Sequence, residues 1–244
     1  MGKWLNGFLD NESTFGRIMG RLAVMIGANL MFLVFSFPVI TVGPALASLF
    51  YVMLETIHRN DTLNPFSLFW KGFKDNLKQG ILCTLGLGAA FMILILDIRF
   101  CRYAGGIWYS FRFGCYALLF LLIVLTAYLF PVMAAFEDTI PNLLRNAFFF
   151  AFRKPWKIIP TAALYVVPAL VTVLDVRYRP LYAFLWVFFG FGLISMMVSE
   201  LLYHDIRQFQ PVDETDGKAV SREDPEKVRA KTEREILREM RKLE

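Results

Sequence analysis

Long uncharged apolar runs dominate this chain and alternate with short basic or aromatic segments. The first run extends from Leu22 to Leu54, about twice the roughly 20 residues that one membrane span needs. Two prolines and a glycine interrupt it within Ser36–Pro44. This pattern predicts a helical hairpin with spans over roughly Ile18–Phe37 and Pro44–Ile57. The return helix is short for a crossing, so a re-entrant or interfacial placement remains open.

An amphipathic segment over Phe66–Gln79 follows the hairpin. One side of the predicted helix is apolar and aromatic, and the other is charged. The apolar side carries Phe66, Phe69, Trp70, Phe73 and Leu77, and the charged side carries Lys71, Lys74, Asp75 and Lys78. Such a helix is expected to lie in the membrane interface, on the cytoplasmic side.

Four further apolar runs predict four more spans. The expected spans are Gly80–Leu96, Phe113–Phe136, Ile158–Leu174 and Leu181–Tyr203, with a loop over Asp97–Arg112 and a polar, basic connection over Glu137–Lys157. The expected fold is therefore an all-α polytopic helical membrane bundle. It has about six transmembrane helices, or five if Pro44–Ile57 does not cross.

The distribution of Lys and Arg predicts the orientation. Eleven basic residues collect on the side of the chain ends and only five on the other side. By the positive-inside rule both termini are cytoplasmic if the hairpin crosses twice. With five crossings the N-terminus lies on the other side. We expect a transmembrane domain over residues 1–204 and a charged cytoplasmic tail over residues 205–244. A mostly charged helix is expected in the tail, from Asp224-Pro225 to Leu243.

Composition supports a membrane protein. Of the 244 residues, 57% are hydrophobic and 25 are Phe, above the usual apolar share of about 45–50% in soluble domains. Residues 1–204 carry 16 Lys and Arg against 10 Asp and Glu. This excess indicates membrane topology and attraction to anionic lipid, not nucleic-acid binding. Cys101 and Cys115 flank one predicted loop, so a disulfide between them remains an alternative. Free thiols are favoured for them and for Cys83.

Residue patterns typical of enzymes are absent from the sequence. Glu55 and Glu200 lie in apolar runs, but near predicted cytoplasmic ends, as do His58 and His204. The chain has no HExxH or CxxC metal pattern, no Walker A sequence and no GxSxG elbow. We therefore predict no catalytic, cofactor-binding or metal-binding residue. Polar residues within spans, such as Asn29, either join helices or line a path, and joining is the commoner role.

The N-terminal third resembles the YesL family of uncharacterised bacterial membrane proteins. The matching positions are Asn29, Phe37-Pro38-Val39, Thr41-Val42-Gly43, Ala45-Leu46, Tyr51, Phe69–Lys74, Asn76, Lys78 and Gln79. Pro44 departs from the pattern, since a small residue is expected there. The resemblance implies a plasma-membrane role linked to oligosaccharide uptake, because family members tend to be encoded beside carbohydrate ABC importers.

Two functions are compatible with these observations. The leading hypothesis is a non-enzymatic accessory or regulatory subunit of carbohydrate ABC import, contacting permease or ATPase subunits. The alternative is an autonomous small-solute transporter or channel, for example as a homo-oligomer. Candidate interaction or motif residues are Asn29, Pro38, Thr41, Gly43, Pro44, Phe69, Trp70, Phe73, Lys74, Asn76, Lys78 and Gln79.

Overall fold

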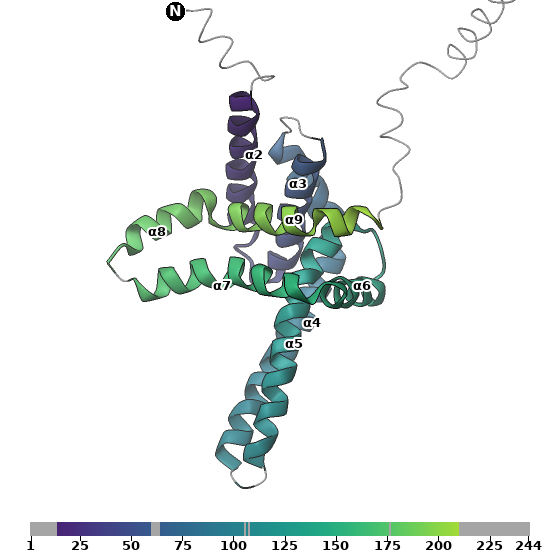
Figure 1. Cartoon of the computed structure of the whole chain (residues 1–244), viewed down its shortest axis with the longest axis vertical. Helices are drawn as coiled ribbons and strands as arrows, with labels where there is room; N and C mark the ends of the chain where they lie inside the picture. Colours follow the sequence, from purple (N-terminus) through teal and green to yellow (C-terminus); the bar gives the residue numbers. More distant parts are fainter. Residues whose placement is uncertain (1–13, 60–63, 105, 107, 176, 210–244) are drawn as a thin grey trace, which may run out of the picture. The chain divides into compact units, whose positions relative to one another are not determined.

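Helices make up the described part of the protein. The computed structural model describes residues 14–59, 64–104, 106, 108–175 and 177–209, and these contain no strand (Figure 1). The helices are α2 (Thr14–Phe35), α3 (Val42–Arg59), α4 (Pro65–Ala104), α5 (Trp108–Ala135), α6 (Ile140–Arg153), α7 (Ile158–Leu174), α8 (Arg179–Leu185) and α9 (Phe191–Arg207). Short helical turns lie at η1 (Val39–Thr41) and η2 (Pro155–Lys157), and a π-helical segment, η3 (Trp186–Gly190), joins α8 to α9. The all-α prediction is confirmed.

Six helical segments in the described residues are long and apolar enough to cross a membrane. They are Ile18–Phe35, Val39–His58, Pro65–Ala104, Tyr109–Ala135, Pro155–Leu174 and Arg179–Arg207. Their order agrees with the predicted order of spans. Helix α3 has 18 residues, and at 1.5 Å per residue it is about 27 Å long, close to the roughly 30 Å hydrocarbon core. Its length and composition favour six crossings over five.

Helix α4 differs from the prediction. The expected interfacial helix Phe66–Gln79 and the span Gly80–Leu96 form one continuous helix of 40 residues, which also contains the first half of the expected loop. The rest of that loop is largely the start of α5, so only residues 105–107 separate α4 from α5. At 1.5 Å per residue α4 is about 60 Å long, twice the hydrocarbon thickness. Its polar N-terminal part therefore extends beyond the apolar layer instead of lying flat in the interface.

The connection expected over Glu137–Lys157 is largely the amphipathic helix α6. Its Leu143, Ala147, Phe150 and Ala151 are buried. Pro155 begins η2, which leads into α7. The aromatic run of this segment thus packs partly inside the protein.

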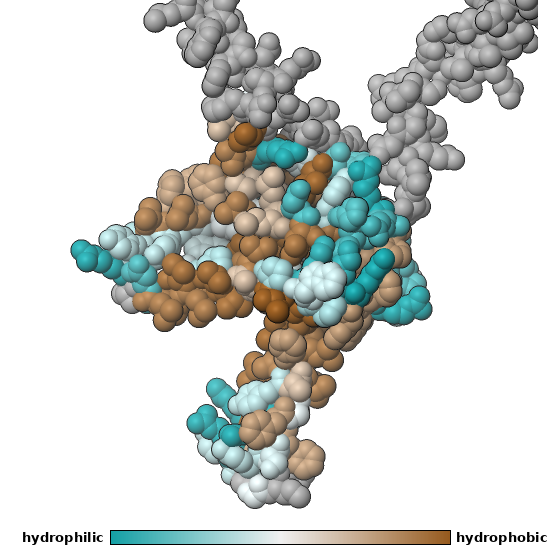
Figure 2. All heavy atoms as spheres, viewed as in Figure 1, coloured by the Kyte–Doolittle hydropathy of each residue, from teal (hydrophilic) through white to brown (hydrophobic). Residues whose placement is uncertain are grey.

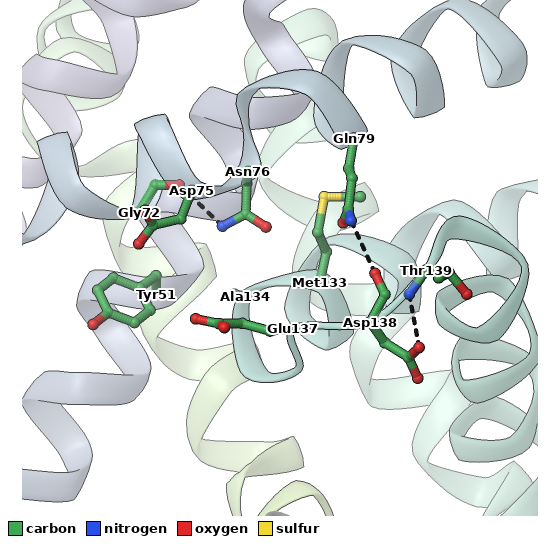
Figure 3. A pocket seen from close by; sticks show the side chains of 10 residues that line it. All are labelled: Tyr51, Gly72, Asp75, Asn76, Gln79, Met133, Ala134, Glu137, Asp138 and Thr139. Atoms are coloured by element: carbon green, nitrogen blue, oxygen red, sulfur yellow. Dashed lines mark hydrogen bonds between the residues drawn. The ribbon is translucent and has the colours of Figure 1, made fainter.

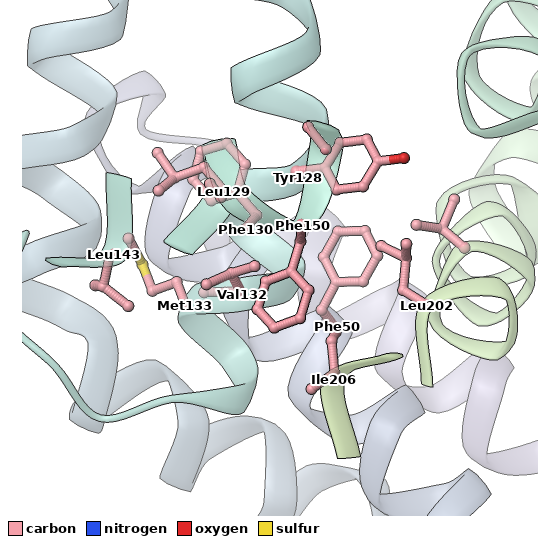
Figure 4. Close-up of a cluster of buried hydrophobic side chains, with 14 of the residues drawn as sticks. Phe50, Tyr128, Leu129, Phe130, Val132, Met133, Leu143, Phe150, Leu202 and Ile206 are labelled. Atoms are coloured by element: carbon pink, nitrogen blue, oxygen red, sulfur yellow. The ribbon is translucent and has the colours of Figure 1, made fainter. Parts of the chain in front are cut away.

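Two clusters of buried side chains hold the helices together. One lies among α2, α3 and the N-terminal part of α4, and includes Met25, Leu49 and Phe69. The other joins α3, α5, α6 and α9, where Phe50, Tyr128, Val132, Met133, Phe150, Leu202 and Ile206 meet (Figure 4). Because lipid is as apolar as these side chains, close packing and hydrogen bonds must supply most of the association energy.

Two apolar hairpins leave much of their surface uncovered. They are formed by the distal parts of α4 and α5, and by α7 with α8. Only 6% of the apolar window is buried in each of the spans Pro65–Ala104 and Pro155–Leu174. Figure 2 shows apolar residues along both hairpins and hydrophilic residues at their ends. An apolar shaft with a polar tip is expected of a hairpin in lipid, so we describe the chain as an integral membrane protein.

The first structural unit covers residues 1–208 and the second covers residues 209–244. The predicted domain boundary lies between residues 204 and 205, within the last turn of α9, which ends at Arg207. Most of the predicted N-terminal head and the predicted tail helix lie outside the described residues.

Candidate functional site

Asn29 joins the first span to the last. Its side chain is fully buried on α2. The amide Nδ2 donates to the carbonyl oxygens of Trp186 at 3.1 Å and Val187 at 2.6 Å. The amide Oδ1 accepts from the backbone N–H of Gly192 at 2.8 Å. Asn29 therefore makes three hydrogen bonds to the backbone of η3 and α9.

The π-helical segment explains why an Asn is needed there. A π-turn shifts the hydrogen-bond pattern within a helix and occurs often at functional sites. Backbone groups without intrahelical partners are costly in an apolar layer, and the Asn29 amide supplies partners of both kinds. Gly192 allows the close approach, because a Cβ there would lie 3.0 Å from the Met25 carbonyl oxygen. The geometry thus gives Asn29 the helix-joining role instead of placing it along an open path.

The interrupting motif forms the turn between α2 and α3. The Thr41 hydroxyl donates to the carbonyl oxygens of Phe35 at 2.7 Å and Pro38 at 2.8 Å. The end of α2 is thereby tied to η1. Pro44 lies in the first turn of α3, where a missing N–H is tolerated.

Gly43 and Pro44 also form a tight crossing with α4. A Cβ on Gly43 would lie 2.5 Å from the Gly80 carbonyl oxygen, and a Cβ on Gly80 would lie 2.6 Å from the Pro44 nitrogen. Thr84 lies at the same crossing, and its hydroxyl donates to the Gly80 carbonyl at 2.7 Å. Only glycines permit this backbone approach. By contrast, a Cβ on Gly86, farther along α4, would meet nothing within 4 Å.

The aromatic and basic residues of α4 are divided between the interior and the surface. Phe69 and Phe73 are buried and pack around Phe35, with ring centroids 5.8 and 4.9 Å from it. The outer side carries residues spaced four apart: Phe66, Trp70, Lys74 and Lys78, all exposed. We call these four residues the α4 stripe.

The remaining candidates of α4, Asn76 and Gln79, line a pocket. It has a volume of about 570 Å³ and lies among α3, α4, the end of α5 and the segment before α6 (Figure 3). The Asn76 amide donates to the Gly72 carbonyl at 2.9 Å, and the Gln79 amide donates to the Asp138 carbonyl at 2.9 Å. The lining comprises Tyr51, Gly72, Asp75, Asn76, Gln79, Met133, Ala134, Glu137, Asp138 and Thr139.

The pocket has an acidic character. Asp138 accepts hydrogen bonds from the Asn142 side chain at 2.8 Å and from the Thr139 backbone N–H at 2.7 Å. These bonds, led by that of Asn142, lower the pKa of Asp138 because they favour the carboxylate. Asp75 and Glu137 supply two more carboxylates. No group of three His, Cys, Asp or Glu side chains in the described residues is arranged to hold a metal ion.

Sequence reasoning missed an ion cluster at the end of α9. Asp205, assigned to the charged tail, is buried and pairs with Lys154 at 2.5 Å and Lys157 at 2.6 Å. Lys157 also donates to the Leu201 carbonyl at 2.6 Å. The available signal was helical spacing, because Val198, Leu202 and Asp205 share a buried side of α9.

The candidate residues thus occupy three separate places. Asn29 lies at the contact of α2 with α9, the Pro38–Pro44 motif lies at the crossing of α3 with α4, and the α4 residues face the core, the surface or the pocket. The cysteines Cys83, Cys101 and Cys115 are free thiols in the structure.

Comparison with known proteins agrees with the sequence resemblance. Residues 25–98 match the family described as "Protein of unknown function, DUF624", and this segment contains all the candidate residues. The chain is 26% identical over 202 residues to the uncharacterized protein YesL of Bacillus subtilis (strain 168), covering 82% of this chain and 91% of that protein. No solved structure matches. Together with the six apolar helices, these similarities support the assignment of the chain to the YesL family of bacterial integral membrane proteins.

Proposed function

We propose that the protein is a non-enzymatic accessory or regulatory subunit of a carbohydrate ABC importer, in the bacterial plasma membrane with both termini in the cytoplasm. The observation that carries the proposal is the α4 stripe, an exposed surface of aromatic and basic side chains. The carbohydrate link rests on the resemblance to the YesL family.

The α4 stripe has the composition of a docking surface. Trp70 is 44% exposed and Phe66 is 55% exposed, although both lie on a helix whose other side is buried. Large aromatic side chains carry much of the binding energy in protein interfaces. Side chains four residues apart on one side of a helix fit a groove on a partner.

The tryptophan of the stripe is already ordered. Its ring centroid lies 5.5 Å from that of Phe35 and 6.1 Å from that of Phe73. The Lys74 ammonium lies 5.0 Å from the Trp70 ring, within cation–π distance. Little conformational entropy would be lost when such a side chain binds a partner. The buried Phe69 and Phe73 therefore support the surface and do not contact the partner.

The length of α4 supports a partner outside the apolar layer. The apolar part of the helix can fill the hydrocarbon core by itself, so the first turns extend beyond it. The excess of basic residues on this side supports a cytoplasmic position. Cytoplasmic parts of the permease, or the ATPase bound to them, are then the partners within reach.

Co-purification from the native host tests the proposal. A tagged chain would be isolated in mild detergent, and ABC permease and ATPase subunits would be quantified by mass spectrometry. The variant W70A/K74E removes the centre of the α4 stripe. R99E, an exposed charge reversal at the far end of the same helix, is the matched control.

The expected result is recovery of importer subunits with the wild type and R99E, and a loss of at least about fivefold with W70A/K74E, which corresponds to about 1 kcal/mol of binding free energy. Recovery of the protein without importer subunits contradicts the proposal. Equal recovery by both variants would place the contact elsewhere and reject the α4 stripe.

An autonomous small-solute transporter or channel is the second candidate. The observation that favours it is the π-helical interruption of the last span at η3, held by a buried Asn29. Transporter sites are often built on interrupted spans. Purified protein in liposomes, assayed as a possible homo-oligomer, would have to move a solute, and absence of flux for sugars and ions would reject this candidate.

A further inference from the structure

The pocket beside α4 has no assigned role. Its volume of about 570 Å³ falls within the roughly 300–1,000 Å³ of small-molecule sites. It is lined by parts of the chain far apart in sequence, with Tyr51 on α3, Asp75 and Gln79 on α4, and Glu137 after α5. Packing of α3, α4 and α5 therefore fixes the shape of the pocket.

Two exposed carboxylates of the lining have no ion-pair partner in the part of the chain that the structure describes. Asp75 and Glu137 form no ion pair within the described residues, whereas the buried Asp205 has two. In Figure 3 the Glu137 carboxylate extends into the pocket toward Tyr51, and Asp75 lies on the α4 side. The pocket thus combines these two negative charges with the Asp138 carboxylate nearby.

The amides of the pocket use their donor groups within the protein. Asn76 and Gln79 each use their NH₂ group on a backbone carbonyl, at 2.9 Å in both cases. No hydrogen bond to either amide oxygen is found in the described residues. The lining therefore offers mainly hydrogen-bond acceptors, and a ligand must bring the donors.

The aromatic ring at the pocket already lies beside a cation of this chain, whose charge also faces Asp75. The ammonium of Lys71 lies 5.7 Å from the centroid of the Tyr51 ring. Gly72 leaves room for this ring, since a Cβ there would lie 3.0 Å from Tyr51 Cδ1. A carboxylate-lined pocket beside a tyrosine suits a positively charged organic group. A metal ion is disfavoured, since no three ligating side chains converge within the described part of the chain.

We propose that this pocket binds an organic cation through an ammonium or guanidinium group, with Asp75 and Glu137 as its counter-charges. Asn76 and Gln79 accept the remaining N–H groups, and Tyr51 contacts the alkyl or cationic part. The group belongs either to a free amine metabolite or to an arginine or lysine of a bound polypeptide. This proposal does not depend on the ABC-importer function.

The test is isothermal titration calorimetry on the full chain in nanodiscs of uncharged phosphatidylcholine, which does not itself attract cations. The first probe is agmatine, which carries an ammonium and a guanidinium group. The second is a short peptide with one arginine and blocked ends, and the third is an uncharged diol of similar length. D75N and E137Q are the test variants, and D97N, an exposed carboxylate on the same helix outside the pocket, is the control.

A free amine is supported as the ligand if agmatine binding weakens about threefold or more in each of D75N and E137Q and persists in D97N. A threefold loss matches the strength of an exposed ion pair. Binding of the arginine peptide alone, with the same variant pattern, supports a polypeptide side chain. Circular dichroism establishes that the variants keep their helices. The proposal is overturned if neither cationic probe binds, if the diol binds equally well, or if D97N weakens binding as much as the pocket variants.

Discussion

Replacement of Asn29 by alanine tests the contact between the first and last spans. The substitution removes three hydrogen bonds to η3 and α9. Interhelical hydrogen bonds in membrane bundles contribute about 0.6 kcal/mol on average and up to about 1.7 kcal/mol. Three such bonds predict a loss of about 2–5 kcal/mol in the free energy of unfolding.

The assay is reversible unfolding in mixed micelles with increasing SDS, followed by circular dichroism. Thr126→Val is the matched control, because the Thr126 hydroxyl donates to the Leu122 carbonyl of its own helix, at 2.7 Å, and not to another helix among the described residues. The control is expected to change stability by less than about 1 kcal/mol. If N29A is no less stable than T126V, the three hydrogen bonds of Asn29 do not hold these helices together and the role given to Asn29 is wrong.

Three further predictions concern other contacts. G80A is expected to lower the free energy of unfolding by about 1–3 kcal/mol through overpacking at the α3–α4 crossing. G86A, in open space, should leave it unchanged or raise it by up to about 1 kcal/mol. Thermal melts in detergent compare the two variants, and equal melting temperatures would argue against the tight crossing. D205N leaves two partly exposed lysines without their carboxylate and should lower the free energy of unfolding by about 1–3 kcal/mol, the cost of a polar group left without its partner. SDS titration measures this loss, and unchanged stability would show that the ion cluster is not formed. Cys115 should react with N-ethylmaleimide before the buried Cys83, as mass spectrometry of timed samples would show, and the reverse order would contradict the packing of α4.

The sequence predicted the spans well because composition decides them. An uncharged run long enough to cross the hydrocarbon layer must be helical, since its backbone groups have no water to bond. The order of the spans and the hairpin turn at Pro38–Pro44 follow from that requirement together with the two prolines.

The continuity of α4 could not be predicted from composition. The change from charged to apolar residues at Gly80 resembles a boundary, and glycine weakens a helix. In the structure the helix continues through Gly80. The residue is a glycine because Pro44 occupies the space that a side chain would fill. That contact joins residues distant in sequence, and no local pattern reveals it.

The sites show the same limit. Asn29 is identifiable as a polar residue in an apolar run, but its partners lie more than 150 residues away. Asp205 is adjacent to a charged segment and was grouped with it, although its position on the buried side of α9 placed it beside two lysines. The pocket depends on the segment after α5 meeting the side of α4, which only tertiary structure defines.

Photo-crosslinking in native membranes tests the central claim most directly. A benzoylphenylalanine at position 70 would replace Trp70 in the α4 stripe, and the same residue at position 82 would replace the exposed Leu82 farther along α4. The account predicts that position 70, and not position 82, forms an adduct with an ABC importer permease or ATPase, identified by mass spectrometry. Adducts at position 70 with lipid alone, or with the same protein species as at position 82, would contradict the proposed docking role.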